Sequence, residues 1–448
     1  MDLNSLLHGI LTAQTIVSAV SILIFVHVNL IAAAYLVYAE RKISAYIQDR
    51  IGPNRVGFDF GLPILKPLKG MIGLGQPLAD GIKFLLKEDF TPNNVDKILF
   101  TIAPAAIVIC AFMGTVLIPW GGNLAIPEFT IPFINVDVDA ATVAVGGAAH
   151  INVGLVYLLA ITSLGVYGVT LGGYASNNKY SFLGGLRATA QMISYEIPLG
   201  LCILVVLLMV GSLKADAIIN HQMTHGWLIL GQPLACIIFF IALLAEGNRA
   251  PFDNAECEQE LVGGYHTEYS SMRFALFFLA EYVSVLTGCA IFALCFLGAY
   301  HIPGVPMTHP SDTSILGVLV KTSVFLGKAV GLVCFMMVIR WTIPRLRYDQ
   351  IMVAAWQGLI PITLVMVIVA SVMVFFGVTN PLYTATANVG LGILAAVVIG
   401  WSAPKVANRK IALAGSRFNP LPGEIPITRP MRAAAADAPH QSLSVPQS

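Results

Sequence analysis

The sequence predicts an all-α, polytopic membrane protein: a bundle of about nine transmembrane helices with one further amphipathic helix in the membrane interface. Of its 448 residues, 57% are hydrophobic and only 11% are charged. The mean hydropathy of +0.79 is typical of membrane proteins rather than of soluble domains. The formal net charge of +1 gives no reason to expect a nucleic-acid partner.

Nine apolar segments are each close to the roughly 20 residues that a helix needs to cross the hydrocarbon core. They cover residues 14–40, 98–120, 151–172, 187–211, 228–247, 273–299, 317–341, 353–378 and 383–403. Residues 1–403 therefore form a transmembrane domain. Residues 1–13, 121–150 and 211–227 carry only loop chemistry. No internal repeat is visible, which argues against the inverted-repeat transporters.

The stretch 61–90 is apolar but is broken by prolines and glycines. After Pro77, three apolar residues fall on one helical face and three charged residues on the other: Leu78, Ile82 and Leu85 against Asp80, Lys83 and Lys87. Thirteen residues cannot cross a bilayer, so we expect a helix that lies in the interface. The alternative is an ordinary cytoplasmic loop helix.

Charge predicts the orientation of the chain. Alternate connections hold 22 of the 25 Lys and Arg residues, namely those at 41–97, 173–190, 248–273 and 340–352 and the tail 404–448. Positive charge is retained on the cytoplasmic side, so we expect the N-terminus outside and the C-terminus inside. The tail 404–448 is rich in Pro, Ala, Ser and Gln, and we expect a mostly disordered cytoplasmic segment.

Acidic residues gather where one apolar segment ends and the next begins. They are Glu246, Asp253, Glu256, Glu258, Glu260, Glu268 and Glu281, with Glu196 in the preceding span as a companion. Burying an unpaired charge in a membrane costs roughly 2.5–3.5 kcal/mol or more, so such acids indicate function. Like charges in a poorly solvated site raise one another's pKa, which suits proton transfer. A solvated acidic loop is the alternative.

Spacings of three and four residues would align Glu246, Arg249, Asp253, Glu256 and Glu260 on one helical stripe. Pro251 disfavours an unbroken helix, so we expect two short helical pieces that meet there. Arg249 would neutralise one or two of the acids.

Lys321 and Lys328 lie within a predicted span and share a helical face. Lys321 would either pair with an intramembrane acid such as Glu281 or belong to a proton path. The seven cysteines show no metal-binding spacing, and six of them sit in apolar stretches. We interpret them as small buried hydrophobic residues.

The segment 39–57, at the inner end of the first span, contains many charged residues: Glu40, Arg41, Lys42, Asp49, Arg50 and Arg55. Lys42 and Arg55 are interpreted as ordinary interfacial anchors. The density of the others indicates a docking surface for a cytoplasmic partner.

Five segments carry a resemblance to a known family. They are ERKISAYIQDRIGPNRVG (40–57), QPLADGIKFLLKED (76–89), KYSFLGGLRATAQMISYEIPLGL (179–201), NRAPFDNAECEQELVGGYHTEYSSMRFALFFLAEY (248–282) and RWTIPRLRYDQIM (340–352). In this order they resemble the H subunits of bacterial respiratory complex I, the proton-pumping NADH:quinone oxidoreductase. The resemblance covers residues of about 14–378, so the ninth segment and the tail lie outside it.

The resemblance implies a membrane subunit that forms much of a quinone tunnel and couples quinone reduction to proton translocation. Carried over by motif, the tunnel residues are Arg41, Arg50, Asp80, Lys83, Arg249, Phe274 and Phe278. The acids named above, with Lys321, would form the proton-coupling set that leads from the quinone cavity into the membrane. Gly247, Asn254, Cys257 and Gln259 depart from the family's usual residues, while every acid and Arg249 match it.

The resemblance also implies the setting. Quinone, either ubiquinone or menaquinone, is the substrate, and FMN and iron–sulfur clusters belong to partner subunits only. The partners would be peripheral-arm subunits at the quinone site, small and antiporter-like membrane subunits, and lipid, in the bacterial inner (plasma) membrane. Three alternatives stay open: the related subunit of a proton-pumping membrane-bound hydrogenase, a stand-alone ion transporter, and an anchor for the peripheral arm.

Overall fold

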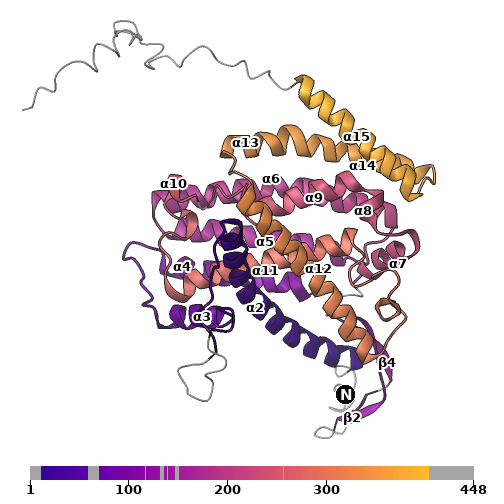
Figure 1. Ribbon diagram of the computed structural model, residues 1–448, viewed down its shortest axis with the longest axis horizontal. Helices are drawn as coiled ribbons and strands as arrows, with labels where there is room; N and C mark the ends of the chain where they lie inside the picture. The colour runs from indigo at the N-terminus through magenta and orange to yellow at the C-terminus, as the bar shows by residue number, and fades with distance from the viewer. Residues whose placement is uncertain are drawn as a thin grey trace, which may run out of the picture. The chain divides into compact units, whose positions relative to one another are not determined.

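The computed structural model describes residues 12–58, 70–116, 118–131, 136–138, 140–146, 151–255 and 257–402 (Figure 1). Within this part of the chain, eight helices are long and apolar enough to cross a membrane. They are α2 (Ala13–Ile47), α4 (Lys97–Val116), α5 (Gly154–Ala175), α6 (Lys179–Val210), α11 (Ser271–Phe296), α12 (Ile315–Thr342), the composite Tyr348–Phe375 and α15 (Pro381–Ser402). The composite helix joins α13 (Tyr348–Val353), the π-helical turn η4 (Ala354–Leu359) and α14 (Ile360–Phe375). The predicted all-α membrane bundle is confirmed.

The predicted span 228–247 is not continuous. It divides into α8 (Leu228–Gly231) and α9 (Pro233–Glu246), and Gln232 between them has a non-helical backbone, with φ −133° and ψ 57°. Proline drives the residue before it away from the helical region, so Pro233 accounts for the break. The 14 residues of α9 are fewer than a span needs. Together the two pieces still extend about 28 Å at about 1.5 Å per residue.

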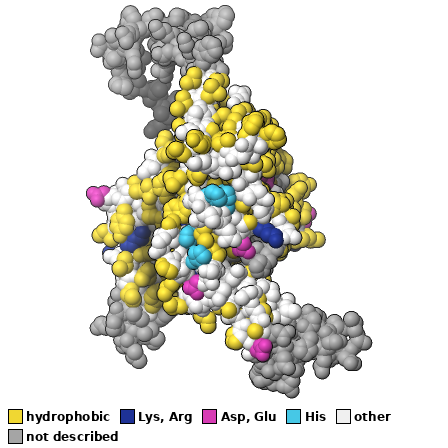
Figure 2. Space-filling view, turned by 90° about the vertical axis from the view of Figure 1, so that its right-hand side faces the viewer, with side chains coloured by type: hydrophobic (Ala, Val, Ile, Leu, Met, Phe, Trp, Pro, Cys, Tyr) yellow, Lys and Arg dark blue, Asp and Glu magenta, His cyan; other side chains and the backbone are white. Residues whose placement is uncertain are grey.

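The bundle is most buried at its centre and apolar on its outside. Of the long helices, α11 has the largest buried share and α6 follows, whereas α2, the composite helix and α15 have small buried shares. The exposed faces carry large hydrophobic side chains, and yellow side chains cover much of the face in Figure 2. A helix that is apolar all round suits a lipid environment.

Small residues allow the central helices to approach closely. A Cβ at Gly168 of α5 would lie 2.8 Å from the Cβ of Ile107 in α4, and one at Gly173 would lie 2.7 Å from the backbone oxygen of Ser181 in α6. Such contacts are typical of helix packing in membranes, where close van der Waals contact replaces the hydrophobic driving force between helices. Larger side chains at these two positions would separate α5 from its neighbours.

Short elements occupy the segments that were predicted to be loops, so that prediction was incomplete. Strand β1 (Gly122–Ile126) pairs antiparallel with β4 (Ala141–Val145), and β2 (Phe129–Ile131) with β3 (Val136–Val138). Helix α7 (Ala215–His225) buries Ile218, Ile219 and Gln222. This spacing of i, i+1 and i+4 is helical, but eleven residues were too short to indicate it clearly.

The predicted amphipathic helix is α3 (Gln76–Leu86), with Pro77 in its first turn. It contacts α2 and α11, at the ends of these helices that face the cytoplasm in the predicted orientation. Its position in a membrane interface stays a prediction, and residues 59–69 of the same stretch lie outside the described part of the chain.

The chain divides into two compact units, residues 1–392 and residues 393–448. Only 393–402, the end of α15, are described in the second unit; the predicted disordered tail 404–448 lies outside the described residues. Five of the seven cysteines are buried, as predicted, and Cys110 and Cys334 are partly buried.

Candidate functional site

The site begins where α9 ends, at Glu246. The stretch is not one unbroken helix, as expected, but α9 ends before Pro251 and the two expected helical pieces do not meet there. A run of turns follows instead, and α10 (Glu258–Leu261) begins only after Cys257. Gln191 of α6 holds this loop, because its Nε2 donates to the carbonyl oxygens of Ala245 at 2.9 Å and Phe252 at 2.7 Å. A buried amide thus positions a segment with little regular structure of its own.

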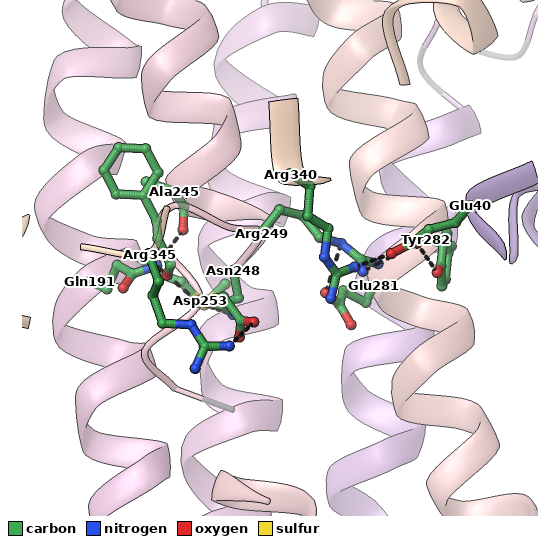
Figure 3. A network of polar contacts seen from close by, with 12 residues as sticks. Glu40, Gln191, Ala245, Asn248, Arg249, Asp253, Glu281, Tyr282, Arg340 and Arg345 are labelled. Carbon is green, nitrogen blue, oxygen red and sulfur yellow. Dashed lines mark hydrogen bonds and ion pairs between the residues drawn. The ribbon is translucent and has the colours of Figure 1, made fainter. Parts of the chain in front are cut away.

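Arg249 projects from this loop into the bundle (Figure 3). Its Nε lies 3.1 Å from Glu281 Oε1 of α11, and its Nη1 lies 3.7 Å from Glu40 Oε2 of α2. The guanidinium also stands 4.5 Å from the ring centroid of Tyr282. Arg249 is only 7% exposed, Glu40 8% and Glu281 9%, so these charges are almost removed from water.

Glu40 joins the network to a fourth element. It forms an ion pair with Arg340 at the end of α12, and the hydroxyl of Tyr282 donates to it. Two arginines therefore face two carboxylates, brought together from α2, α11, α12 and the loop after α9. Buried ions are stable only when they are paired and hydrogen-bonded, and this arrangement meets that condition.

A second ion pair fixes the same loop. Asp253 Oδ2 accepts from Arg345 Nη2 at 2.8 Å, and Asp253 is buried. Burial raises the pKa of Asp253 above its ordinary value, although Arg345 and Arg340 act in the opposite direction. Burial also lowers the pKa of His266 to about 4. The pKa of Asp253 is thus shifted toward neutral pH, and His266 is uncharged at neutral pH.

A cavity of about 40 Å³ lies between α4, α5, α6 and α11. Its polar lining includes Glu246, Asn248, Glu281, Ser284 and Thr287. A polar space of this size holds one or a few water molecules. Beside it, Ser163 of α5 donates to the carboxylate of Glu196 on α6. The structure therefore brings Glu246 and Glu281 to one cavity.

Other predicted coupling acids lie apart from this cavity. Glu260 pairs with Arg187 at 2.5 Å on a half-exposed surface, and Glu268 accepts from Asn178 Nδ2 at 2.6 Å. Glu258 belongs to α10, whose first side chains are not described, and Glu256 lies outside the described residues.

Of the two alternatives for Lys321, pairing with Glu281 is not found in the described structure. The Lys321 side chain is fully buried and its Nζ donates to the carbonyl oxygen of Asp312 at 2.5 Å. The ammonium also lies 5.6 Å from the ring centroid of Tyr300. These partners belong to the end of α12 opposite Arg340, because Lys321 lies near the start of that helix.

The predicted tunnel residues gather around α2, α3 and α11. Arg41 forms a 2.7 Å ion pair with Asp80 of α3. Phe274 lies 4.6 Å from Phe278 and 6.2 Å from Phe84 of α3 between ring centroids. His266 lies 5.2 Å and 5.7 Å from the rings of the same two α11 phenylalanines. Arg50 and Lys83 are exposed.

Several members of the network were not predicted as site residues. They are Glu40, Gln191, Tyr282, Arg340 and Arg345. Glu40 was assigned to a docking surface, and the two arginines were counted as positive-inside charges. The one signal available was the crowding of charge at the ends of three spans, because only the packed bundle brings these ends together.

The fold and site define a polytopic α-helical membrane protein that holds buried ion pairs at one end of its bundle. The chain belongs to the NADH dehydrogenase family, whose model matches residues 20–371. Helix α15 lies beyond that match. In the described part of the chain, no group of three or more His, Cys, Asp or Glu side chains is arranged to hold a metal ion.

Curated relatives give the same assignment. The chain is 41% identical over 342 residues to the NADH-quinone oxidoreductase H subunit 1 of Cytophaga hutchinsonii, covering 76% of this chain and 92% of the relative. It is 42% identical over 353 residues to the H subunit 1 of Geobacter sulfurreducens, covering 79% and 93%. It is 45% identical over 340 residues to the H subunit of Protochlamydia amoebophila, covering 76% and 92%.

Proposed function

We propose that this chain is the membrane subunit of an NADH:quinone oxidoreductase complex that forms the quinone tunnel and couples quinone reduction to proton translocation. The relatives named above are subunits of such an enzyme, and they are matched over nearly their full length. The observation that carries the proposal is the buried network of Arg249, Glu40, Glu281 and Arg340, set beside an aromatic group on α11.

The tunnel would open between α2, α3 and α11. Phe84, Phe274 and Phe278 offer an apolar path for an isoprenoid tail, since aromatic rings bury large areas and pack tightly. Arg41 and Asp80 form a polar group at the junction of α2 and α3, with Arg50 and Lys83 nearby in sequence. Arg249 would meet the substrate end of the tunnel, because it stands between the loop and α11.

The proton path would begin at Asp253 and the Arg249 network and continue through the small cavity. Glu281 contacts Arg249 and also lines the cavity, so protonation of Glu281 would weaken the hold on Arg249 and move charge toward Glu246. Glu196, held by Ser163, would pass the change outward to neighbouring membrane subunits. Glu256, Glu258, Glu260, Glu268 and Lys321 stay predicted members of this path.

The remaining parts of the complex are inferred from the family. This chain would carry no electrons; FMN and iron–sulfur clusters would reside in partner subunits of the peripheral arm. Quinone would be the substrate, and small and antiporter-like membrane subunits would lie alongside. The N-terminus would face outward and the tail the cytoplasm, as the distribution of Lys and Arg predicts.

Replacing single glutamates by glutamine tests the proposed coupling of quinone reduction to proton translocation. In the intact complex, Glu246→Gln and Glu281→Gln are expected to lower protons pumped per NADH oxidised, because an amide cannot carry a proton. Glu128→Gln, on an exposed acid of the β1–β2 turn, is the matched control and should pump normally. Assembled complexes of both variants with wild-type pumping ratios would refute the proposed path.

A further inference from the structure

His221 and His225 stand one turn apart on α7, at the end of the bundle opposite the charged network. Their ring centroids are 4.5 Å apart and their planes differ by 18°. His225 is exposed and His221 is partly buried. Figure 2 shows a group of histidines on this side of the molecule. Neither histidine belongs to the tunnel or to the proton path.

A hydrogen bond holds the ring of His225 in place. Its Nδ1 lies 2.8 Å from Thr224 Oγ1 and 3.4 Å from the carbonyl oxygen of His221. When Nδ1 donates to these oxygens, Nε2 of His225 carries the lone pair. Metal-binding histidines are held in the same way, with one nitrogen donating and the other free to coordinate.

The spacing of the two rings suits one ion. Two nitrogen ligands of a tetrahedral ion lie roughly 3.3 Å apart when each bond is about 2.0–2.1 Å. The two rings lie on the same helical face with their centroids 4.5 Å apart, so side-chain rotation can bring one nitrogen of each ring to that separation.

An open groove of about 620 Å³ adjoins the pair. Thr224 and His225 form one wall, and the turn between α14 and α15 forms the other, with Asn380 and Tyr383 among its residues. Carbonyl, amide and phenol oxygens on that wall, together with water, can complete a coordination shell that two imidazoles leave open.

We propose that His221 and His225 form a binding site for one divalent transition cation of the copper, nickel or zinc type on the outer face. Imidazole nitrogen suits these ions better than Mg²⁺ or Ca²⁺, which take oxygen ligands. A bound ion would also stand next to the turn that leads into α15, the helix beyond the family match. This site is independent of quinone binding and proton transfer.

Cu²⁺ is the probe for this site. The full chain is purified in detergent with a tag that contains no histidine and titrated with Cu²⁺, and electron spin echo envelope modulation counts the coordinated imidazoles. The wild type should show two imidazoles on one ion. His221→Ala and His225→Ala should each leave one, and affinity should fall on the order of 100-fold, since the second ligand of a rigid pair binds at high effective concentration.

A matched variant separates pairing from histidine count. Asn220→His combined with His221→Ala keeps two histidines on α7, but five residues apart they point about 140° away from each other. It should bind as weakly as the single variants, while His309→Gln on the same face should bind like the wild type. One imidazole per ion in the wild type, or equal affinity in the chain lacking both histidines, would overturn the proposal.

Discussion

Glu40 shows what single residues contribute to this protein. Near the C-terminal end of α2, it forms an ion pair with Arg340 and a longer one with Arg249, and it accepts a hydrogen bond from Tyr282. Each partner compensates part of the cost of removing a carboxylate from water. From the sequence alone, Glu40 is only one more charged residue beside Arg41, because the sequence does not show which charges the helix bundle encloses.

Replacing Glu40 by Gln should destabilise the chain strongly. The buried Arg249 and the partly buried Arg340 would each lose a carboxylate, and breaking a buried pair from one side costs about 3–5 kcal/mol. Glu260→Gln is the control, since its pair with Arg187 is half exposed and worth at most about 1 kcal/mol. Thermal unfolding of the detergent-solubilised chain measures both. Equal shifts for the two variants would contradict the assigned burial of the network.

The pH dependence of stability should depend on His266. Burial lowers its folded-state pKa to about 4, whereas the unfolded value is about 6.5. The stability linked to neutral His266 is complete above about pH 6.5 and is lost progressively as the pH falls toward 4, by at most about 3 kcal/mol. The raised pKa of Asp253 has the opposite effect, because it lowers the stability as the pH rises above the ordinary pKa of an aspartate.

His266→Gln should therefore flatten the dependence of the unfolding temperature on pH between about 6.5 and 4. His309→Gln, at an exposed position, serves as the reference for losing an imidazole. If the two variants keep the same slope as the wild type, His266 is protonated in the folded chain and its burial does not govern this range.

At the scale of elements, α11 is held at both ends. Near its start, Ser271 donates to the carbonyl oxygens of Phe84 and Lys87, which ties it to α3. At its other end, Gln222 of α7 donates to the carbonyl oxygens of Leu294 at 2.8 Å and Cys295 at 3.2 Å. Terminal carbonyl groups of a helix have no partner within the helix, so these side chains satisfy them.

Lys328 completes this end of α11. Its Nζ donates to the carbonyl oxygens of Leu297, Ala299 and His301 at 2.6–2.8 Å and lies 4.9 Å from the ring centroid of Trp227. The sequence left an acid or a proton path open as the partner of the two lysines. Backbone carbonyls compensate this charge instead, because they are strong acceptors in a region that excludes water.

Lys328→Met should destabilise the chain by several kcal/mol, because each buried carbonyl left without a donor costs about 1–3 kcal/mol. Lys214→Met changes a lysine at an exposed position of the same side of the bundle and should have little effect. Thermal unfolding of the chain and the protease resistance of residues 298–306 measure the loss of stability. A Lys328→Met chain as stable as Lys214→Met would show that these carbonyls find other partners.

At the scale of the whole molecule, the sequence predicted the helical class and eight of the nine spans as continuous helices, because apolar length is a strong signal. It did not predict the break at Gln232, the two hairpins or α7, where short elements depend on packing. It placed the acids in one region but not their partners. Gln191, Arg340 and Arg345 come from remote positions, and only the folded bundle brings them to the loop that carries Arg249 and Asp253.

The central claim is that the Arg249 network stands at the quinone tunnel and links it to the proton path. The direct test is NADH:quinone activity and proton pumping in membranes carrying Arg249→Ala, with native gels to confirm assembly. Arg249→Lys retains the charge but loses the two-nitrogen contact with Glu281 and Glu40. Lys214→Ala, which removes a positive charge at an exposed position outside the network, is the control.

We predict an assembled complex in which quinone reduction by Arg249→Ala falls on the order of 100-fold, as expected for a displaced positioning group, with a raised apparent KM for quinone. Arg249→Lys should be intermediate and Lys214→Ala normal. Assembled Arg249→Ala complexes with normal quinone reduction and normal pumping would contradict the claim. Arg249 would then be a structural counter-ion, and the quinone path would lie away from the loop after α9.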